Sequence, residues 1–305
     1  MAARRLWLVF SAELSAYALV ILIVHARFGI DLVGLVAFLP LAALGLRVFI
    51  VVASFVFAAS AQAQPRLDFL VWLHMLAAET LAFLRFQLLI AMHPRNDAAL
   101  PAQDANVPLV VLLHGVYCNG AVWRPIVDDL RRRTGCTIRT PDLEPPTASL
   151  DAQALALGRW LQAIVDSDPP RPIIVVAHSL GGLMVRRYLM QEPHAGLRFV
   201  CIGTPHRGTL VARVLQAPIG RDLRPNSVAL VQLERASPPR DAVNIYATHD
   251  NLVVPARSSE LSGVRNCAVI GCGHMALIYS PEVRDLLCAE IDRLCDLGPA
   301  SSATT

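Results

Sequence analysis

The sequence contains few charged residues for its length, and positive and negative charges nearly balance. Charged residues make up 17% of the 305 residues, whereas a typical soluble domain has about 25%. The formal net charge is only +3, and no run of basic residues is interleaved with aromatic ones. These absences argue against a nucleic-acid-binding protein, so nucleic acid is not an expected partner.

The seven cysteines lack the spacing of a metal site. None forms a C-x-x-C pair, and the five-residue separation of Cys267 and Cys272 matches no zinc signature. An odd and irregular set instead favours small buried thiols in a reducing compartment over a framework of disulfides. We expect neither a metal nor an organic cofactor.

Apolar residues are abundant, at 54% of the chain, and the excess lies within residues 1–92. Arg4 and Arg5 precede an apolar run over residues 6–24, which is long enough for a membrane-spanning helix of about 20 residues. A signal peptide shares the basic start, but its apolar core is shorter and no A-x-A cleavage pattern follows this run. A second apolar run, over residues 30–60, favours an anchor over a cleaved signal.

Pro40 and Arg47 interrupt the second apolar run. A charge inside lipid costs about 3 kcal/mol on insertion scales. Arg47 therefore marks a break in the helix, an interfacial position or a pairing with Glu13, and the sequence leaves these three open.

A third apolar segment, residues 67–92, carries polar residues that gather on no single helical face. These polar residues are Asp68, His74, Glu79, Arg85 and Gln87. The segment is compatible with a third span, a helix lying at the membrane interface or a helix packed on the domain that follows. A membrane-associated helix is favoured.

The number of spans decides the topology. The positive-inside rule places Arg4 and Arg5 in the cytoplasm. Two spans return the rest of the chain to the cytoplasm, whereas three leave it outside. The odd and irregular set of cysteines, which indicates a reducing compartment, favours the cytoplasmic side for the rest of the chain.

The composition changes after residue 92, and four parts are expected. Residues 1–92 form a membrane-anchoring helical region with two or three apolar helices, and residues 93–107 are a polar linker containing Pro94 and Pro101. Residues 108–296 form the catalytic domain and residues 297–305 a disordered tail.

Strand and helix patterns alternate within residues 108–296, which predicts a mostly parallel sheet with helices on both faces. The predicted strands are residues 109–113, 136–139, 173–177, 197–202, 243–247 and 267–270. The predicted helices are residues 121–133, 150–165, 183–190 and 283–294.

Residues 172–182, P-I-I-V-V-A-H-S-L-G-G, combine an apolar strand, a tight turn and the start of a helix, with Ser179 at the apex. This context is the one that a nucleophile elbow requires. The turn needs small residues two positions before and after the serine, and Ala177 and Gly181 stand there. The alternative is an ordinary serine in a glycine-rich loop or at a helix N-cap.

Asp250 and His274 each follow a predicted strand, downstream of Ser179. The order Ser, Asp, His is that of one class of triad hydrolases, in which the acid orients the imidazole that activates the serine. Gly271 and Gly273 let the backbone bend so that the ring can reach the serine. The competing acids are Asp222, Asp241 and Glu260, and the neighbouring His249 is interpreted as a loop residue.

The loop after the first strand of this domain reads His114-Gly115-Val116. In triad hydrolases with the order Ser, Asp, His, that loop and the residue after the nucleophile supply the two N–H groups that stabilise the oxyanion. We expect these donors to be the backbone N–H groups of Val116 and Leu180. Supporting roles in the elbow and the loop are expected for His114, Gly115, His178 and Gly181.

The motifs H-G-V, A-H-S-L-G-G, G-T-P-H-R-G-T and G-H-M together resemble the α/β-hydrolase superfamily. They look most like the bacterial triacylglycerol lipase and esterase group, which is similar to the GPI inositol-deacylase proteins. The resemblance covers residues 108–294 and implies an α/β-hydrolase fold, preceded here by a transmembrane helical region. In that group the stretch 203–209 leads into a mobile lid. Residues 207–225 are therefore a candidate lid, or else a helix packed on the sheet.

The resemblance implies a serine ester hydrolase that forms an acyl-enzyme, and the membrane anchor suggests lipid or other hydrophobic acyl esters as substrates. The bacterial inner membrane is then the expected location, with the bilayer as a partner. An acyltransferase using the same triad and a non-catalytic membrane scaffold with a relic fold are the alternatives. The sequence does not indicate an oligomeric state.

Overall fold

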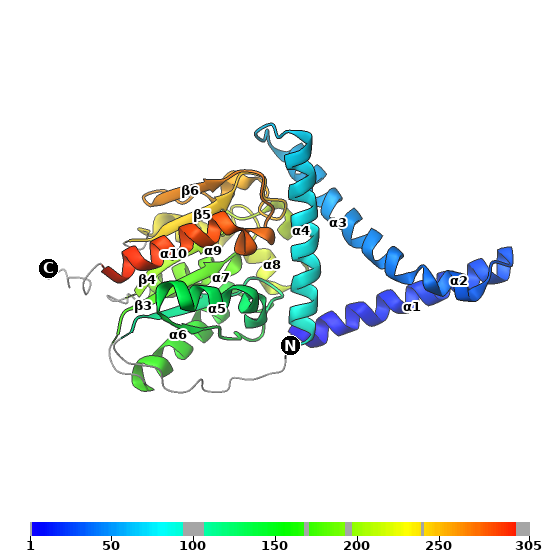
Figure 1. The fold of residues 1–305 in the computed structure, drawn as a ribbon. Helices are drawn as coiled ribbons and strands as arrows, with labels where there is room; N and C mark the ends of the chain where they lie inside the picture. The colour runs from blue at the N-terminus through cyan, green and yellow to red at the C-terminus, as the bar shows by residue number, and fades with distance from the viewer. Residues whose placement is uncertain (1, 94–106, 168–170, 193–196, 239–240, 297–305) are drawn as a thin grey trace.

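The computed structural model describes residues 2–93, 107–167, 171–192, 197–238 and 241–296 (Figure 1). The predicted tail 297–305 and nearly all of the predicted linker 93–107 lie outside these residues. A mixed α/β part is formed by the chain from residue 107 onward, and a set of helices built from residues 2–91 lies against one side of it.

The core of the α/β part is a six-stranded parallel sheet with the strand order β2-β1-β3-β4-β5-β6. In the register of the central strands, Ile173 of β3 pairs with both Leu109 of β1 and Leu197 of β4. The strands are β1 (Leu109–Leu113), β2 (Thr137–Arg139), β3 (Ile173–His178), β4 (Leu197–Ile202), β5 (Val243–Ala247) and β6 (Arg265–Val269). The predicted parallel sheet is confirmed.

Helices cover both faces of the sheet because the strands are apolar on both sides. Val110, Ile174 and Val176 belong to one buried cluster, which also contains residues of α5 and α10. Val111 and Val175 belong to a second cluster with α6 and α7. The helices of this part are α5 (Arg124–Thr134), α6 (Leu150–Ser167), α7 (Leu180–Gln191), α8 (Pro218–Asp222), α9 (Val228–Arg235) and α10 (Pro281–Asp296). Short 3₁₀ helices are η1 (Gly120–Trp123), η2 (Leu210–Val214), η3 (Ala256–Ser259) and η4 (Ala276–Tyr279).

Several predicted boundaries differ from the structure by one or two residues, and three elements differ in a way that has a clear cause. The predicted helix 121–133 is divided into η1 and α5, because Asn119 caps η1 and Pro125 lies at the start of a new helix. The last strand covers residues 265–269, since its register with β5 ends at Val269 and Ile270 is exposed. Helix α7 begins directly after Ser179, three residues earlier than predicted.

The first 91 residues form α1 (Ala2–Phe28), α2 (Leu32–Ala37), α3 (Leu39–Ala61) and α4 (Phe69–Ala91). Figure 1 shows α4 along the side of the α/β part, while α1 and α3 project away from it and meet at α2. The segments Ala2–Phe28, Leu32–Ala61 and Phe69–Ala91 are each long and apolar enough to cross a membrane, judged by length and composition. We call the projecting unit α1–α3 the helical arm.

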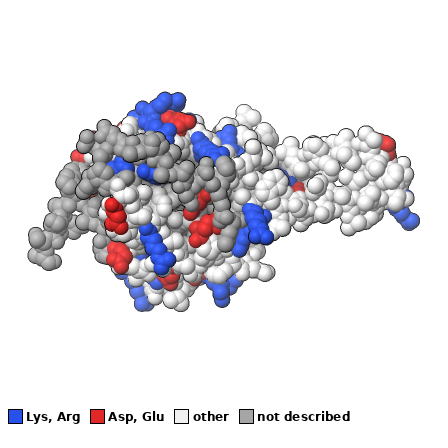
Figure 2. Space-filling model, turned by 90° about the horizontal axis from the view of Figure 1, so that it is seen from below, with Lys and Arg blue, Asp and Glu red and all other residues white. Residues whose placement is uncertain are grey.

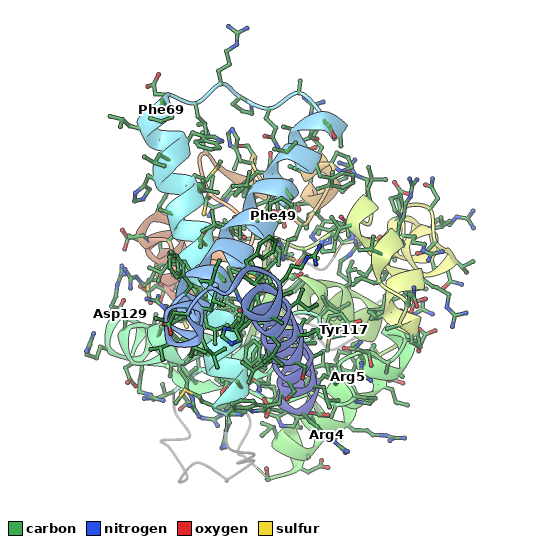
Figure 3. All side chains as sticks on the ribbon, turned by 90° about the vertical axis from the view of Figure 1, so that its right-hand side faces the viewer. Arg4, Arg5, Phe49, Phe69, Tyr117 and Asp129 are labelled. Atoms are coloured by element: carbon green, nitrogen blue, oxygen red, sulfur yellow. The ribbon has the colours of Figure 1, made fainter. Side chains whose placement is uncertain are left out.

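The surface of the helical arm is mostly uncharged, and Figure 2 shows it almost entirely white beside the charged α/β part. Large apolar side chains are exposed on all sides of it, among them Leu8, Leu22, Phe38 and Phe49. In Figure 3 the arm points toward the viewer, with Arg4 and Arg5 at the foot of α1. A surface of this kind fits a hydrocarbon solvent better than water.

Arg47 lies inside α3 and pairs with Glu13 of α1, so of the three interpretations the pairing is the one that the structure shows. Its Nη2 donates to Glu13 Oε2 at 2.7 Å, and its Nη1 also bonds to the same carboxylate. Its Nε donates to Oε1 of Gln87 on α4 at 3.3 Å. The break in the helix occurs instead at Phe38, where α2 ends, and Pro40 lies at the start of α3.

Helix α4 packs on the α/β part, as one of the three interpretations of residues 67–92 proposed. Ala82, Phe86 and Ile90 belong to the same buried cluster as one face of the sheet. The opposite side of α4 exposes Leu81 and Leu88. One face of α4 is therefore core and the other is apolar surface.

Candidate active site

Ser179 occupies the turn between β3 and α7 in a backbone conformation that residues other than glycine rarely adopt. Its φ is 56° and its ψ is −123°, and its N–H donates to the carbonyl of Ile202 at 2.8 Å. A strained, well-anchored turn of this kind holds the side chain at the carboxyl edge of the sheet. Only 9% of the residue is exposed.

Gly181 and Gly182, which follow Ser179, leave different amounts of space for a side chain. A Cβ at Gly181 would lie 3.0 Å from the carbonyl oxygen of His114, whereas a Cβ at Gly182 would lie 2.1 Å from Oγ1 of Thr204. Gly182 is therefore the more constrained position. The sequence pattern indicated a need for a small residue at Gly181. It did not indicate that the side chain of Thr204 lies against Gly182.

The structure brings Ser179, His274 and Asp250 together, although they are far apart in the sequence. Nε2 of His274 lies 3.0 Å from Oγ of Ser179, and its Nδ1 lies 2.8 Å from Oδ2 of Asp250. The other carboxylate oxygen of Asp250 accepts hydrogen bonds from the N–H groups of Leu252 (2.9 Å) and Val253 (2.6 Å). Asp250 is fully buried, so its carboxylate is fixed on both sides.

This arrangement assigns the tautomer of His274. A carboxylate accepts hydrogen bonds only, so Nδ1 carries the proton and Nε2 is free to accept the proton of Ser179. Burial lowers the pKa of His274, but the negative charge and hydrogen bond of Asp250, together with the charge of Glu79, outweigh burial and raise the pKa overall. The imidazole is thereby made a stronger base.

The competing acids have other partners. Oδ2 of Asp222 accepts from the N–H of Leu150 at 2.8 Å, and Oε1 of Glu260 accepts from the hydroxyl of Tyr246 at 3.3 Å. Asp241 lies before β5, at the opposite edge of the sheet.

The loop after β1 lies directly beside Ser179. A Cβ at Gly115 would lie 2.9 Å from Cβ of the serine, so only glycine fits without movement. Among the described residues, the N–H groups of Val116 and Leu180 donate to no protein acceptor. Leu180 is also the first residue of α7, where helix N–H groups lack intrahelical partners.

His114 and His178 are buried and neutral. His114 donates through Nδ1 to the carbonyl of Gly115 (2.9 Å), and its Nε2 accepts from the N–H of Leu143 (3.3 Å). His178 lies against the His274 ring, with 4.8 Å between ring centroids, and its Nε2 donates to the carbonyl of His274 at 3.2 Å. Burial lowers the pKa of both side chains. Their supporting roles stay a prediction.

A cavity of about 640 Å³ opens onto Ser179 and His274. One part of its wall comes from the α/β part, and its members include Val116, Tyr117, Val211, Leu215 and Leu252. The other part comes from α1 and α4, through Arg5, Leu6, Val9, Phe83, Phe86 and Gln87. No sequence pattern indicated that α1 contributes to the site.

Residues 207–225, the candidate lid, cover this cavity as η2 and α8. Val211 and Leu215 line the cavity, while Val214 is 76% exposed and points elsewhere. Ile219 is fully buried. The segment therefore packs as part of the fold, and its mobility as a lid stays a prediction.

Within the residues that the structure describes, no group of three or more His, Cys, Asp or Glu side chains is arranged to hold a metal ion. All seven cysteines are free thiols in the structure.

The chain is similar in sequence to known hydrolases. The family described as the alpha/beta hydrolase family matches residues 110–261. The sn-1-specific diacylglycerol lipase ABHD11 of Mus musculus is 28% identical over 109 residues, which are 35% of this chain and 36% of that protein. The chain thus matches about a third of the length of this curated relative.

Solved structures with this architecture include two lipases. The mature Bacillus licheniformis lipase BlEst2 is 15% identical, with a TM-score of 0.54, and the match covers 63% of this chain and 95% of that one. Aspergillus fumigatus lipase B is 17% identical, with a TM-score of 0.55, covering 67% and 56%. At these identities the likeness establishes the fold.

Proposed function

Because the chain belongs to the α/β-hydrolase family, in its lipase and esterase group, we propose that it is a membrane-anchored serine ester hydrolase with Ser179, His274 and Asp250 as its catalytic triad. The observation that carries this proposal is the hydrogen bond between Ser179 Oγ and His274 Nε2 at the wall of the apolar cavity. The Asp250 contact to the other ring nitrogen supports it.

The reaction follows from this geometry. Nε2 of His274 removes the proton from Ser179 as Oγ attacks the ester carbonyl. The oxyanion that forms accepts hydrogen bonds from the N–H groups of Val116 and Leu180, which have no protein acceptor among the described residues. The protonated imidazole then gives its proton to the leaving alcohol. In the second half, His274 activates water, which releases the acid from the acyl-serine.

The cavity supports an acyl ester of a lipid as the substrate. Its wall is almost wholly apolar around Ser179, and helices α1 and α4, two of the three candidate membrane spans, supply one side of it. If these helices lie in the bilayer, an acyl chain has a short route from the lipid to the serine. The relative described as a diacylglycerol lipase makes a glycerolipid the first substrate to test.

The helical arm supports a cytoplasmic location for the α/β part. The start of α1 lies beside the end of α4 and the end of α3 lies beside its beginning, so the open side of the hairpin formed by α1 and α3 faces the α/β part (Figure 1). This arrangement supports the proposal that the arm enters the membrane and returns. Arg4 and Arg5 lie near the start of α1 and Arg66 follows α3, whereas Arg27 lies near the far end of the arm. The side of the arm nearer the α/β part thus carries more arginines. By the positive-inside rule the end with more arginines faces the cytoplasm.

The test is turnover of a short chromogenic ester and of diacylglycerol by the detergent-solubilised full chain. Ser179→Ala is expected to lower kcat on the order of 10⁴-fold or more, because the nucleophile is lost. Ser167→Ala, at the exposed end of α6, is the matched control and should retain wild-type turnover. Unchanged turnover in Ser179→Ala would reject the assignment of the nucleophile.

A further inference from the structure

Glu79 lies on the face of α4 that packs against the α/β part, and only 1% of it is exposed. Its Oε1 accepts a hydrogen bond from the N–H of Met275 (3.1 Å), and its Oε2 accepts one from the N–H of Ala276 (2.8 Å). These two N–H groups directly follow His274 in the chain. A carboxylate on α4 therefore fixes the backbone that carries the imidazole.

The segment that carries the imidazole, residues 270–275, is neither strand nor helix, and we call it the His274 loop. Two other side chains that hold it also contact the first 91 residues, one at α3 and one at the segment between α3 and α4. Asn251 accepts from the N–H of His274 at 3.0 Å and donates to Oγ of Ser54 on α3 at 2.8 Å. His249 accepts from the N–H of Gly271 at 3.2 Å and donates to the carbonyl of Pro65 at 2.9 Å.

Glu79 also determines the shape of the loop. A Cβ at Gly273 would lie 2.5 Å from Oε2 of Glu79, so the carboxylate fills the space that any side chain at 273 would need. The sequence explained Gly273 by its freedom to bend. The structure shows that close approach of Glu79 is what requires glycine there, while Gly271, with a φ of 66°, is the residue in the left-handed conformation.

We propose that Glu79 is a positioning residue for His274, so that α4 is part of the catalytic unit as well as of the membrane attachment. Without the carboxylate, one buried N–H group, that of Ala276, and one part-buried N–H group, that of Met275, lose their acceptors and the loop shifts to find others. A shift of the imidazole relative to Ser179 lowers the rate of proton transfer more than it lowers substrate binding. This inference rests on the proposed function.

The charge of Glu79 gives the proposal a second signature. The groups that face His274 are Asp250 from the loop after β5, Glu79 from α4 and His178 from the end of β3. Asp250 and Glu79 raise the pKa of His274, while His178 is neutral. Removing the charge at position 79 should therefore lower the pKa of His274 and move the acid limb of the kcat/KM profile to lower pH. If Glu79 only docked α4 on the domain, its replacement would leave the acid limb unmoved.

The experiment uses the full chain in detergent with p-nitrophenyl butyrate, and compares Glu79→Ala and Glu79→Gln with Thr80→Val. Thr80 is a buried neighbour on α4 whose hydroxyl donates to the carbonyl of Leu76 in the same helix. It therefore controls for altered packing of α4. Thermal unfolding of each variant shows whether it is folded.

In Glu79→Ala we expect kcat to fall roughly 10–100-fold with little change in KM, the scale of effect of a displaced catalytic group. Glu79→Gln keeps one acceptor and the side-chain volume, so it should recover part of kcat while still moving the acid limb. Gly273→Ala should also lower kcat, because its Cβ displaces the carboxylate. The double variant Glu79→Ala/Gly273→Ala should then be no worse than Glu79→Ala alone, since the clash has been removed.

Wild-type kcat and an unmoved acid limb in folded Glu79→Gln would overturn the positioning role, and so would additive effects of the Glu79 and Gly273 changes. Glu79→Gln also decides the matter where Glu79→Ala fails to fold. If Ser179→Ala remains active, the proposed function itself fails. If Ser179→Ala is inactive and Glu79→Gln is indistinguishable from Thr80→Val, only the role of Glu79 is rejected.

Discussion

The α/β part and the helices of the first 91 residues place apolar and polar side chains in opposite ways. In the α/β part, apolar residues are buried on both faces of the sheet, and polar residues gather at the carboxyl edge of the strands. In the helical arm, apolar residues are exposed, and the charged pair Glu13–Arg47 lies inside the arm. Where the two parts meet, α4 is buried on one face and carries Glu79 to the His274 loop.

Apolar helices in this chain have two different surroundings. The helical arm exposes apolar side chains, whereas α4 exposes them on one face only and buries the other against the α/β part. The cavity beside Ser179 needs residues from both regions. The two regions are therefore expected to share one active site, and separate changes in each should show how far this sharing extends.

The largest effect is expected from a change wholly inside the α/β part. Asp250→Asn replaces a charged acceptor with an amide that cannot stabilise the imidazolium, and kcat should fall by about 10⁴-fold. Because Asp250 raises the pKa of His274 above its ordinary value of 6.5, activity requires a pH above that raised value. In Asp250→Asn the residual activity should extend to lower pH.

Asp241→Asn is the matched control in pH profiles of kcat/KM. Asp241 is exposed at the other edge of the sheet, and asparagine tolerates its φ of 59°. Equal losses in the two variants would contradict the assigned role of Asp250.

A smaller effect is expected from α1, where it contributes to the cavity. Val9 lines the cavity, and Val9→Trp should lower the ratio of long-chain to short-chain ester turnover by about tenfold by narrowing the acyl site. Leu8→Trp, at a position that is 64% exposed and outside the cavity wall, should leave that ratio unchanged. The measurement is kcat/KM across a series of p-nitrophenyl esters. Equal ratios in both variants would remove α1 from the substrate site.

The smallest effect on ester turnover is expected from changes inside the arm, at the Glu13–Arg47 pair. Arg47→Met leaves Glu13 unpaired, and breaking a buried ion pair costs about 3–5 kcal/mol. The thermal midpoint in detergent should therefore fall, mainly through loosening of α1 against α3. Glu13→Leu/Arg47→Met removes both charges and should recover most of the loss. A double variant as unstable as Arg47→Met would mean that the pair is needed for more than its charge balance.

Much of the α/β part could be predicted from sequence, because its strands are continuous apolar runs and its site residues follow strand ends. Parallel strands bring their carboxyl ends to one edge, which is why Ser179, Asp250 and His274 meet. Strand ends were less certain, since β6 is defined by its register with β5 and not by its own apolar residues.

The role of α4 could not be predicted from sequence. Its polar residues follow no single face, because Glu79 serves the His274 loop while Gln87 contacts Arg47 of the arm. Composition shows that a helix is apolar but not what covers it. The close contacts of Gly182 and Gly273 are likewise set by residues distant in the sequence, Thr204 and Glu79.

The most direct measurement is the rate at which a fluorophosphonate labels Ser179, followed by mass spectrometry of the intact chain and of its peptides. We expect a single adduct on Ser179 in the wild type, formed at the same rate in Thr80→Val and roughly tenfold more slowly in Glu79→Ala. An adduct on another residue, or none on a folded wild-type chain, would contradict the proposed nucleophile. Equal labelling rates in all three proteins would contradict a single active site shared between the two regions.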